Sequence, residues 1–167
     1  LGRAIKREQV TFSCVNPRDF ATDVHRTVDD RPYGGGPGMV LKVEPVRAAI
    51  DKALAELPAG SPVIFLGPQG TQFDQSVAIK LSQLPGMLLV AGRYEGFDER
   101  LLESIGGEEL SLGDFVLSGG EVAAAAIIDS VVRLLPGVLG DDSSAEQDSF
   151  MGGLLDHPHY TLSLIHI

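Results

Sequence analysis

At 167 residues, with 44% apolar and 22% charged side chains, the chain has the size and composition of one domain with a substantial core, which excludes a low-complexity protein. A single cysteine, Cys14, excludes an internal disulfide and a cysteine-based zinc site. No apolar run reaches the roughly 18 residues that a membrane span requires. With no signal peptide visible at Leu1, the sequence predicts a cytoplasmic protein without a membrane partner.

Charge is distributed unevenly along the chain, and the net charge of −10 disfavours a general phosphate-binding surface. Residues 1–50 hold 8 Lys and Arg against 6 Asp and Glu, whereas residues 51–167 hold 5 against 17. We therefore expect any contact with a polyanion to lie in the first third of the chain, where the cations are concentrated.

The first third of the chain predicts a helix end, a strand and a glycine-rich loop. Residues 1–7 have the pattern of the end of a helix, and the alternation in Gln9–Val15 is typical of a strand. After a turn at Asn16–Phe20, Gly and Pro dominate the run Pro32–Met39. This run lacks the spacing of a dinucleotide or Walker A fingerprint, so it is either a structural loop or one whose backbone approaches another group closely.

Helical and strand segments alternate through the middle of the chain. They are a helix over 44–57, a strand over 62–66, a helix over 74–84 with Asp74 as its N-cap, and a strand over 87–91. This order predicts an α/β fold with a mostly parallel sheet flanked by helices. Ligands bind such sheets at the carboxyl ends of the strands, and the predicted turns Gly67–Gly70 and Gly92–Gly96 occupy such ends.

The last third predicts a short helix over Phe97–Glu103, a strand and loop over Leu110–Leu117, and a long helix that ends at Leu135. Ser118 and Glu121 have the spacing of a capping box at the start of that helix. Its small, apolar stretch indicates either burial in a subunit interface or an ordinary core helix. Residues 140–147 are polar, and we expect them to form a mobile loop.

Six motifs, in this order, resemble the bacterial tRNA (guanine-N1)-methyltransferases. They are His25–Met39, Pro68–Gly70, Gly92–Gly96, Gly113–Glu121, Pro136–Gly140 and Asp156–Tyr160. Each motif alone is a weak signal, but together they are specific, and the resemblance covers about Leu1 to Thr161. It implies a SPOUT-class methyltransferase domain over residues 1–161, with a C-terminal trefoil knot, working as a homodimer that shares its active sites between subunits.

The reaction that the resemblance implies is methyl transfer from S-adenosylmethionine to N1 of the tRNA guanosine 3′-adjacent to the anticodon, guanosine 37. The product is 1-methylguanosine. Guanine N1 is protonated at neutral pH, so a base must remove the proton and a donor must stabilise the charge that spreads to O6. Asp148 matches the family's general base, and Arg133 matches its O6-stabilising arginine. Without the resemblance, Asp148 would be interpreted as a helix cap and Arg133 as a solvated helix residue.

Three glycine-rich segments match the family's methyl-donor site, where backbone groups can hydrogen-bond the adenine edge. Their residues are Phe65, Leu66, Gly67, Pro68, Gly92, Tyr94, Glu95, Gly96, Leu112, Gly113, Phe115, Leu117, Gly119 and Gly120. Tyr94 and Glu95 could instead serve in surface packing and as a helix N-terminal charge. Glu95 is also a candidate for the Mg2+ that the family requires, although the sequence shows no cluster of metal ligands. His157 and His159 have the spacing of a metal pair, but a structural turn is the preferred interpretation.

The segment that carries His25, Arg26, Asp29 and Asp30 resembles the family's contact with the guanosine and the tRNA backbone. Asp29 is the best candidate to read a guanine edge, because a carboxylate accepts from N1–H and N2–H together. The alternative is that it anchors a polar loop.

The chain departs from the family at both ends. The family has a strand before the position of Leu1 and a helical domain after Thr161, and we expect residues 162–167 to be a non-native tail. We therefore expect weak donor binding and poor methylation of tRNA. Two other hypotheses remain open: a SPOUT-class RNA methyltransferase with a different target base, and a catalytically inactive RNA-binding module.

Overall fold

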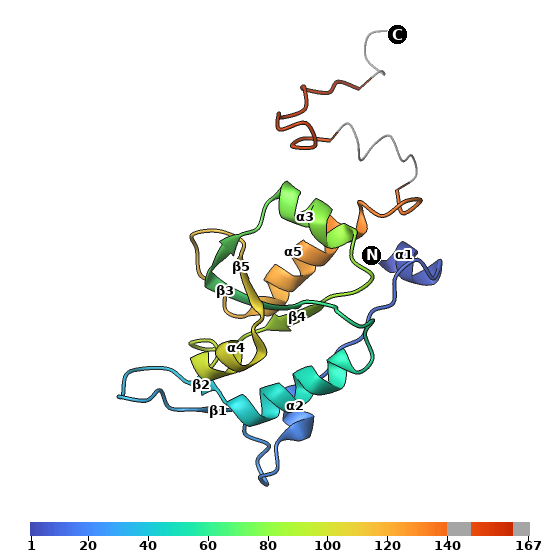
Figure 1. Ribbon diagram of the computed structural model, residues 1–167. Coiled ribbons are helices and arrows are strands. Elements are labelled where there is room, and N and C mark those ends of the chain that lie inside the picture. The colour runs from blue at the N-terminus through green and yellow to red at the C-terminus, as the bar shows by residue number, and fades with distance from the viewer. Residues whose placement is uncertain (140–147, 162–167) are drawn as a thin grey trace.

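The structure, a computed structural model, describes residues 1–139 and 148–161, and its centre is a three-stranded parallel sheet (Figure 1). The strand order is β4 (Leu88–Ala91), β3 (Val63–Gln72), β5 (Glu108–Ser111). Central β3 pairs in parallel with both neighbours, so Phe65 lies opposite Val90 on one side and Glu109 on the other. The predicted α/β fold with a parallel sheet flanked by helices is confirmed.

Four helices cover the two faces of this sheet (Figure 1). One face is covered by α2 (Val43–Leu54) and α4 (Glu99–Ile105), and the other by α3 (Gln75–Ser82) and α5 (Gly120–Val132). Successive strand residues point to opposite faces, which divides the core into two clusters. Val63 and Phe65 pack under α2 and α4, whereas Ile64 and Leu66 pack against α3 and α5. Continuous apolar composition in β3 is therefore explained by burial on both faces.

A second, very small sheet lies beside α2 and α4. Its strands, β1 (Asp29–Asp30) and β2 (Val40–Leu41), pair antiparallel. The loop between them is the predicted glycine-rich loop, which the structure confirms as irregular. On its other edge, β2 bonds to the loop after β4: the Leu41 N–H donates to the Gly96 carbonyl at 2.9 Å, and the Asp98 N–H donates to the Leu41 carbonyl at 3.2 Å.

The N-terminal helix α1 (Gly2–Lys6) confirms the expected helix end, and it lies near the end of α5. The Arg7 side chain donates to the Gly137 carbonyl at 3.3 Å, and the Gln9 amide donates to the Pro136 carbonyl at 3.2 Å. The turn expected at Asn16–Phe20 is a short 3-10 helix, η1 (Pro17–Phe20). Among the described residues, no helix combines the length and the hydropathy that crossing a bilayer demands.

Two expectations about strands are wrong or incomplete. The predicted strand Gln9–Val15 is extended but pairs with no strand in the described part of the chain. Alternation shows that a segment can form a strand, but only a neighbouring edge makes it one. The predicted turn Gly67–Gly70 lies within β3, where Leu110 pairs with both Leu66 and Thr71. These four residues bulge out of the ladder rather than ending the strand.

The predicted capping box is also wrong. Gly119 is the N-cap of α5, without a side-chain cap, and the Glu121 carboxylate instead pairs with Arg93.

The observed helix boundaries differ from the predicted ones by a few residues: α2 ends at Leu54 rather than 57, and α5 ends at Val132 rather than Leu135. The N-cap role of Asp74 is confirmed, because its carboxylate accepts from the Val77 N–H at 2.9 Å. The expected loop 140–147 and tail 162–167 lie outside the described residues.

Candidate functional site

Two of the three predicted donor loops meet where β4 ends. The Gly120 N–H donates to the Gly92 carbonyl at 2.7 Å, and Arg93 forms an antiparallel bridge with Gly119. The Arg93 side chain then reaches the Glu121 carboxylate at 2.7 Å. Burial tends to raise the pKa of Glu121, but hydrogen bonds from its own N–H and from Arg93 hold that pKa below its ordinary value.

This junction depends on the absence of a side chain at Gly120. A Cβ there would lie 2.8 Å from the Ala91 Cα and 2.9 Å from the Gly92 nitrogen. Both are backbone atoms, so neither could move aside without distorting the end of β4. Glycine therefore lets the first turn of α5 approach the strand end, which is the arrangement that places backbone groups beside a ligand.

The third predicted donor segment, Gly67–Gly70, lies against β5, and the segment Leu112–Gly120 follows directly after β5. Sequence reasoning missed Ser111 at this junction. Its side chain is buried, and its hydroxyl lies 3.2 Å from both the Gly113 carbonyl and the Gly113 N–H. A serine that ends an apolar strand and precedes a glycine loop is a signal that could have identified it.

The side chains of the predicted donor-binding residues differ in their exposure to solvent. Tyr94 and Phe115 are 54% and 55% exposed, and Leu117 is also exposed, so an apolar edge faces outward here. Phe65 and Leu66 are buried in the two core clusters, and the Phe65 ring packs edge-on against Phe97 with centroids 5.2 Å apart. Phe65 is 0% exposed and Leu66 is 6% exposed, so neither presents its side chain to a ligand in this structure.

Glu95 is held under the glycine-rich loop. Its N–H donates to the Met39 carbonyl at 2.9 Å, and its side chain occupies the position that a Cβ on Gly38 would take. Gly38 also has a φ of +85°, a region that side-chain-bearing residues rarely adopt. The loop can thus lie flat on Glu95 only because residue 38 is glycine.

The predicted substrate segment is bonded to the same small strand as the donor loop. Asp29 pairs with Leu41, and Leu41 bonds on its other side to Gly96. Adjacent strands are about 4.8 Å apart, so the backbones of Asp29 and Gly96 are separated by roughly 10 Å. The structure therefore brings the predicted guanosine-contact segment and a predicted donor loop together within one chain.

The loop that presents His25 and Arg26 is organised by Asp23. Its carboxylate accepts from the His25 N–H at 2.9 Å, the Thr27 N–H at 2.9 Å and the Thr27 hydroxyl at 2.7 Å. These hydrogen bonds, the hydroxyl above all, hold the pKa of Asp23 below its ordinary value. Arg26 adopts a φ of +50°, and its carbonyl accepts from Arg18 at 3.0 Å.

The two predicted catalytic residues are in contact. Arg133 is the C-cap of α5, and its Nη2 lies 2.7 Å from Asp148 Oδ2. The contact is ionic rather than an aligned hydrogen bond, because Oδ2 is inaccessible to solvent yet accepts no well-directed bond from any described residue. A pocket of about 290 Å³, lined by residues of α1 and of the end of α5, opens beside Arg133.

This predicted catalytic pair lies far from the predicted donor loops of its own chain. The helix α5 has 13 residues and begins at Gly120, beside the loops. With a rise of 1.5 Å per residue, its C-terminal end is roughly 20 Å away from its start. One chain therefore holds the donor loops at one end of α5 and the Arg133–Asp148 pair at the other.

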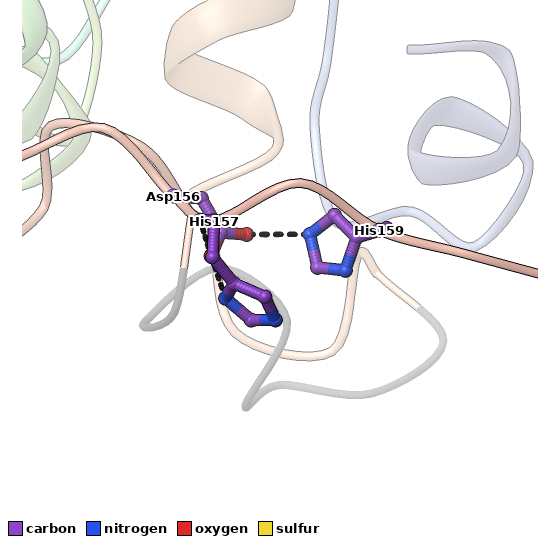
Figure 2. Close-up of side chains that lie close together, drawn as sticks. All are labelled: Asp156, His157 and His159. Atoms are coloured by element: carbon purple, nitrogen blue, oxygen red, sulfur yellow. Dashed lines mark hydrogen bonds and ion pairs between the residues drawn. The ribbon is translucent and has the colours of Figure 1, made fainter.

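His157 and His159 lie in a segment without helix, strand or turn, so the expected turn is not present there. The carboxylate of Asp156 lies 2.8 Å from one ring nitrogen of each histidine, in an ion-pair contact with His157 Nδ1 and a hydrogen bond with His159 Nε2 (Figure 2). The hydrogen bond from His159 is the largest of the causes that hold the pKa of Asp156 below its ordinary value. These residues lie apart from the donor loops and take no part in the arrangement described above.

A parallel sheet in which glycine-rich loops follow β4 and β5 is the arrangement typical of α/β domains that bind ligands at that edge of the sheet. A family model, tRNA (guanine-1)-methyltransferase TrmD, matches residues 1–165, and the chain belongs to that family.

Proteins similar to this chain bear closely related names. The tRNA (guanine-N(1)-)-methyltransferase of Hahella chejuensis is 61% identical over 161 residues, which are 96% of this chain and 62% of that relative. The protein of the same name from Methylococcus capsulatus is 60% identical, over 96% of this chain and 64% of the relative. The crystal structure of tRNA (m1G37) methyltransferase from Aquifex aeolicus superposes with a TM-score of 0.74 at 44% identity, covering 84% of this chain and 62% of that one. The chain thus spans less than two thirds of the length of these relatives.

Proposed function

We propose that this chain contributes the methyl-transfer domain of an enzyme that methylates N1 of guanosine 37 in tRNA, using S-adenosylmethionine, to give 1-methylguanosine. The observation that carries the proposal is the contact between Arg133 and Asp148, at 2.7 Å. The family resemblance names these two residues as stabilising group and base, and the fold brings them together across the polar segment that separates them in sequence. Family membership and the names of the relatives support the choice of tRNA guanine as the substrate.

The residues at the carboxyl edge of the sheet fit S-adenosylmethionine. Gly92, Gly119 and Gly120 keep side chains away from the strand ends, while Tyr94 and Phe115 offer exposed rings. Backbone groups and aromatic faces suit an adenine ring, which carries hydrogen-bonding edges and no charge. When bound, the sulfonium supplies an activated methyl group, so the protein's part is to orient the donor and the acceptor.

The chemistry assigned to the side chains is proton removal and charge stabilisation. The Asp148 carboxylate would take the proton from guanine N1, and the electron pair left on N1 would form the bond to the methyl carbon as the donor's carbon–sulfur bond breaks, its electron pair leaving on the now neutral sulfur of S-adenosylhomocysteine. The Arg133 guanidinium donates to O6, onto which negative charge delocalises as the proton leaves. In the structure the two groups neutralise each other, so guanine entering between them would exchange one ionic contact for two substrate contacts.

We also propose that the enzyme is a homodimer whose active sites are completed across the interface. The roughly 20 Å length of α5 separates the Arg133–Asp148 pair from the donor loops of the same chain. Val122 on α5 is 63% exposed, and Ala125 and Ala126 beside it are exposed as well, so this helix offers an apolar face. Covering that face with a second copy would remove it from water and allow one subunit's pair to approach the other subunit's loops.

The trefoil knot implied by the resemblance belongs to the same proposal, as does a cytoplasmic location, where tRNA is modified. Magnesium has no assigned step. In the described part of the chain, the one group of three potential metal ligands is Asp156, His157 and His159. Two imidazoles do not suit Mg2+, which prefers oxygen ligands, and Glu95 lies outside that group.

The proposal is tested by methyl transfer from labelled S-adenosylmethionine to tRNA transcripts with guanosine or adenosine at position 37. We expect calorimetry to detect donor binding by this chain, with slow transfer that occurs only to guanosine 37. Replacement of the base by Asp148→Asn should lower the transfer rate by about 10² to 10⁴ while donor affinity is retained. Asp51→Asn, on the exposed face of α2, is the matched control.

Two results would contradict this assignment. Methylation that maps to another nucleotide would favour a SPOUT-class enzyme with a different target base. Tight RNA binding without donor binding would favour an inactive RNA-binding module.

A further inference from the structure

The cluster formed by Asp156, His157 and His159 has a geometry that the proposed methyl transfer does not use. Asp156 Oδ1 lies 2.8 Å from His157 Nδ1, and Oδ2 lies 2.8 Å from His159 Nε2 (Figure 2). The two rings are tilted against each other with centroids 4.6 Å apart. One potential ligand atom from each of the three residues lies within 4.8 Å of the others.

The local backbone holds these side chains on one side of the chain. His157 and His159 both contact the Asp156 carboxylate, so their rings lie on the same side of the chain (Figure 2). Pro158 between them fixes its own φ and restricts His157 to extended conformations. Asp156 is anchored by two hydrogen bonds: its N–H donates to the Ser149 hydroxyl at 2.9 Å, and its carboxylate accepts from the His157 N–H at 2.7 Å.

Both histidine side chains are open to solvent, with 78% and 70% of their surface exposed. An ion can therefore reach them without disturbing the fold. Four ligands at about 2 Å around a zinc ion lie roughly 3.3 Å apart, so modest side-chain rotations would suffice. Each ring also has a second nitrogen that faces away from the carboxylate. Water can fill the coordination positions of the ion that the protein leaves open.

We propose that Asp156, His157 and His159 form a surface site for a divalent transition-metal ion of the zinc class. Two imidazoles and one carboxylate suit Zn2+, Ni2+ and Cu2+, whereas Mg2+ and Ca2+ prefer all-oxygen sites. The bond from Asp156 to Ser149 connects this site to the residue that follows Asp148. A bound ion would therefore fix the segment that leads away from the proposed base.

The test is calorimetric titration of the whole chain with ZnCl2, carried out in a Cys14→Ser background because Cys14 is an exposed thiol. We expect one ion per chain in that background. His157→Gln and His159→Gln should each weaken zinc affinity by at least about tenfold, because loss of even an indirect partner commonly has that effect. The double variant should abolish the site, and Mg2+ at the same concentration should give no binding isotherm.

Control variants distinguish this site from nonspecific binding by imidazole. His25→Gln should leave zinc affinity unchanged, since His25 does not belong to the cluster. Substoichiometric Cu2+ should broaden the imidazole proton resonances of His157 and His159 before those of His25. Unchanged zinc affinity in the double variant, or equal broadening of all histidines, would overturn the proposal. Neither result depends on methyl transfer, so these experiments test the metal site independently of the proposed function.

Discussion

Asp23 shows how much of a site lies in residues that do no chemistry. Sequence reasoning selected His25, Arg26 and Asp29 because their side chains can hydrogen-bond a base or a phosphate. It did not select Asp23, whose carboxylate accepts hydrogen bonds from the His25 N–H and from the N–H and hydroxyl of Thr27. Residue types can be matched to a reaction from the sequence alone. Which polar group organises the backbone around them depends on loop geometry, which the one-letter sequence does not contain.

We predict that Asp23→Asn weakens tRNA binding severalfold and leaves donor affinity unchanged. The amide retains one acceptor oxygen, but its NH2 group cannot accept from the Thr27 hydroxyl, so the loop that presents His25 loses part of its order. Filter binding of a tRNA anticodon stem-loop and calorimetry with the donor measure the two effects. Thr27→Val, which removes the hydroxyl alone, should produce a smaller effect in the same direction; equal donor and tRNA losses would argue against a local role.

Glu109 provides a prediction about pH. Burial, and then the nearby Glu99 carboxylate, raise the pKa of Glu109 above its ordinary value. The folded state thus disfavours the ionised form, and this destabilisation is present above the folded pKa and disappears as the pH falls below the ordinary value. Glu109→Gln should therefore raise Tm at pH 7, with a gain that shrinks toward pH 4. Thermal unfolding between pH 7 and pH 4 measures this gain in Tm, and Glu108→Gln, at an exposed position, is the control. An equal change in Tm for both variants would show that burial of Glu109 is not the cause.

At the scale of elements, the sequence predicted the helices and strands that are determined by local residue patterns. It missed the features that depend on a contact with a residue distant in sequence. The alternation of helices and strands from α2 to β4 was predicted because both faces of β3 and β4 are buried and Asp74 caps α3 locally. The strand at Gln9–Val15 failed because no described strand lies along it. The capping box at Glu121 failed because Arg93, 28 residues away in sequence, binds the carboxylate more strongly than an N-terminal amide would.

The contact between the start of α5 and the end of β4 can be tested with Gly120→Ala. Helix propensity alone favours alanine by about 1 kcal/mol. A Cβ 2.8 Å from the Ala91 backbone opposes this, since overpacking costs about 1–3 kcal/mol. We expect a net loss of stability with weaker donor binding, measured by urea unfolding and calorimetry. Gly152→Ala, where a Cβ would meet nothing within 4 Å, should change neither quantity; a stabilised Gly120→Ala variant would show that the strand end adapts freely.

At the scale of the whole molecule, the two halves of the proposed active site lie at opposite ends of one helix. The predicted helix that ends at Leu135 already separates Gly119 and Gly120 from Arg133, and the structure adds how α5 lies across the sheet (Figure 1). The excess of acidic residues after position 50 also makes the basic first third the part of the chain that we propose for tRNA contact. In the proposed homodimer a second copy would resolve the separation, and the exposed apolar face of α5 would provide the place for it.

We predict that Val122→Glu converts a dimer into a monomer. A carboxylate at the centre of an apolar interface would be desolvated without a partner, which strongly opposes association. Light scattering after size exclusion measures the mass, and methyl transfer should fall together with it while donor binding persists. Val24→Glu introduces the same charge at a site that is exposed far from α5 and should leave the mass unchanged. A dimeric Val122→Glu protein would place the interface elsewhere.

The two-residue strand β2 has a thermodynamic consequence. Asp29 is bonded to one of its edges and Gly96 to the other, so the proposed guanosine-recognition segment and the proposed donor loop share a single backbone ladder. Ordering of either partner restricts the motion of Val40 and Leu41, and part of the entropy lost in that step need not be lost again when the second ligand arrives. Linkage then makes the effect reciprocal: whatever factor the methyl donor adds to the affinity for guanosine, guanosine adds to the affinity for the donor. A stretch of chain just long enough to be called a strand would thereby make the two substrates cooperate.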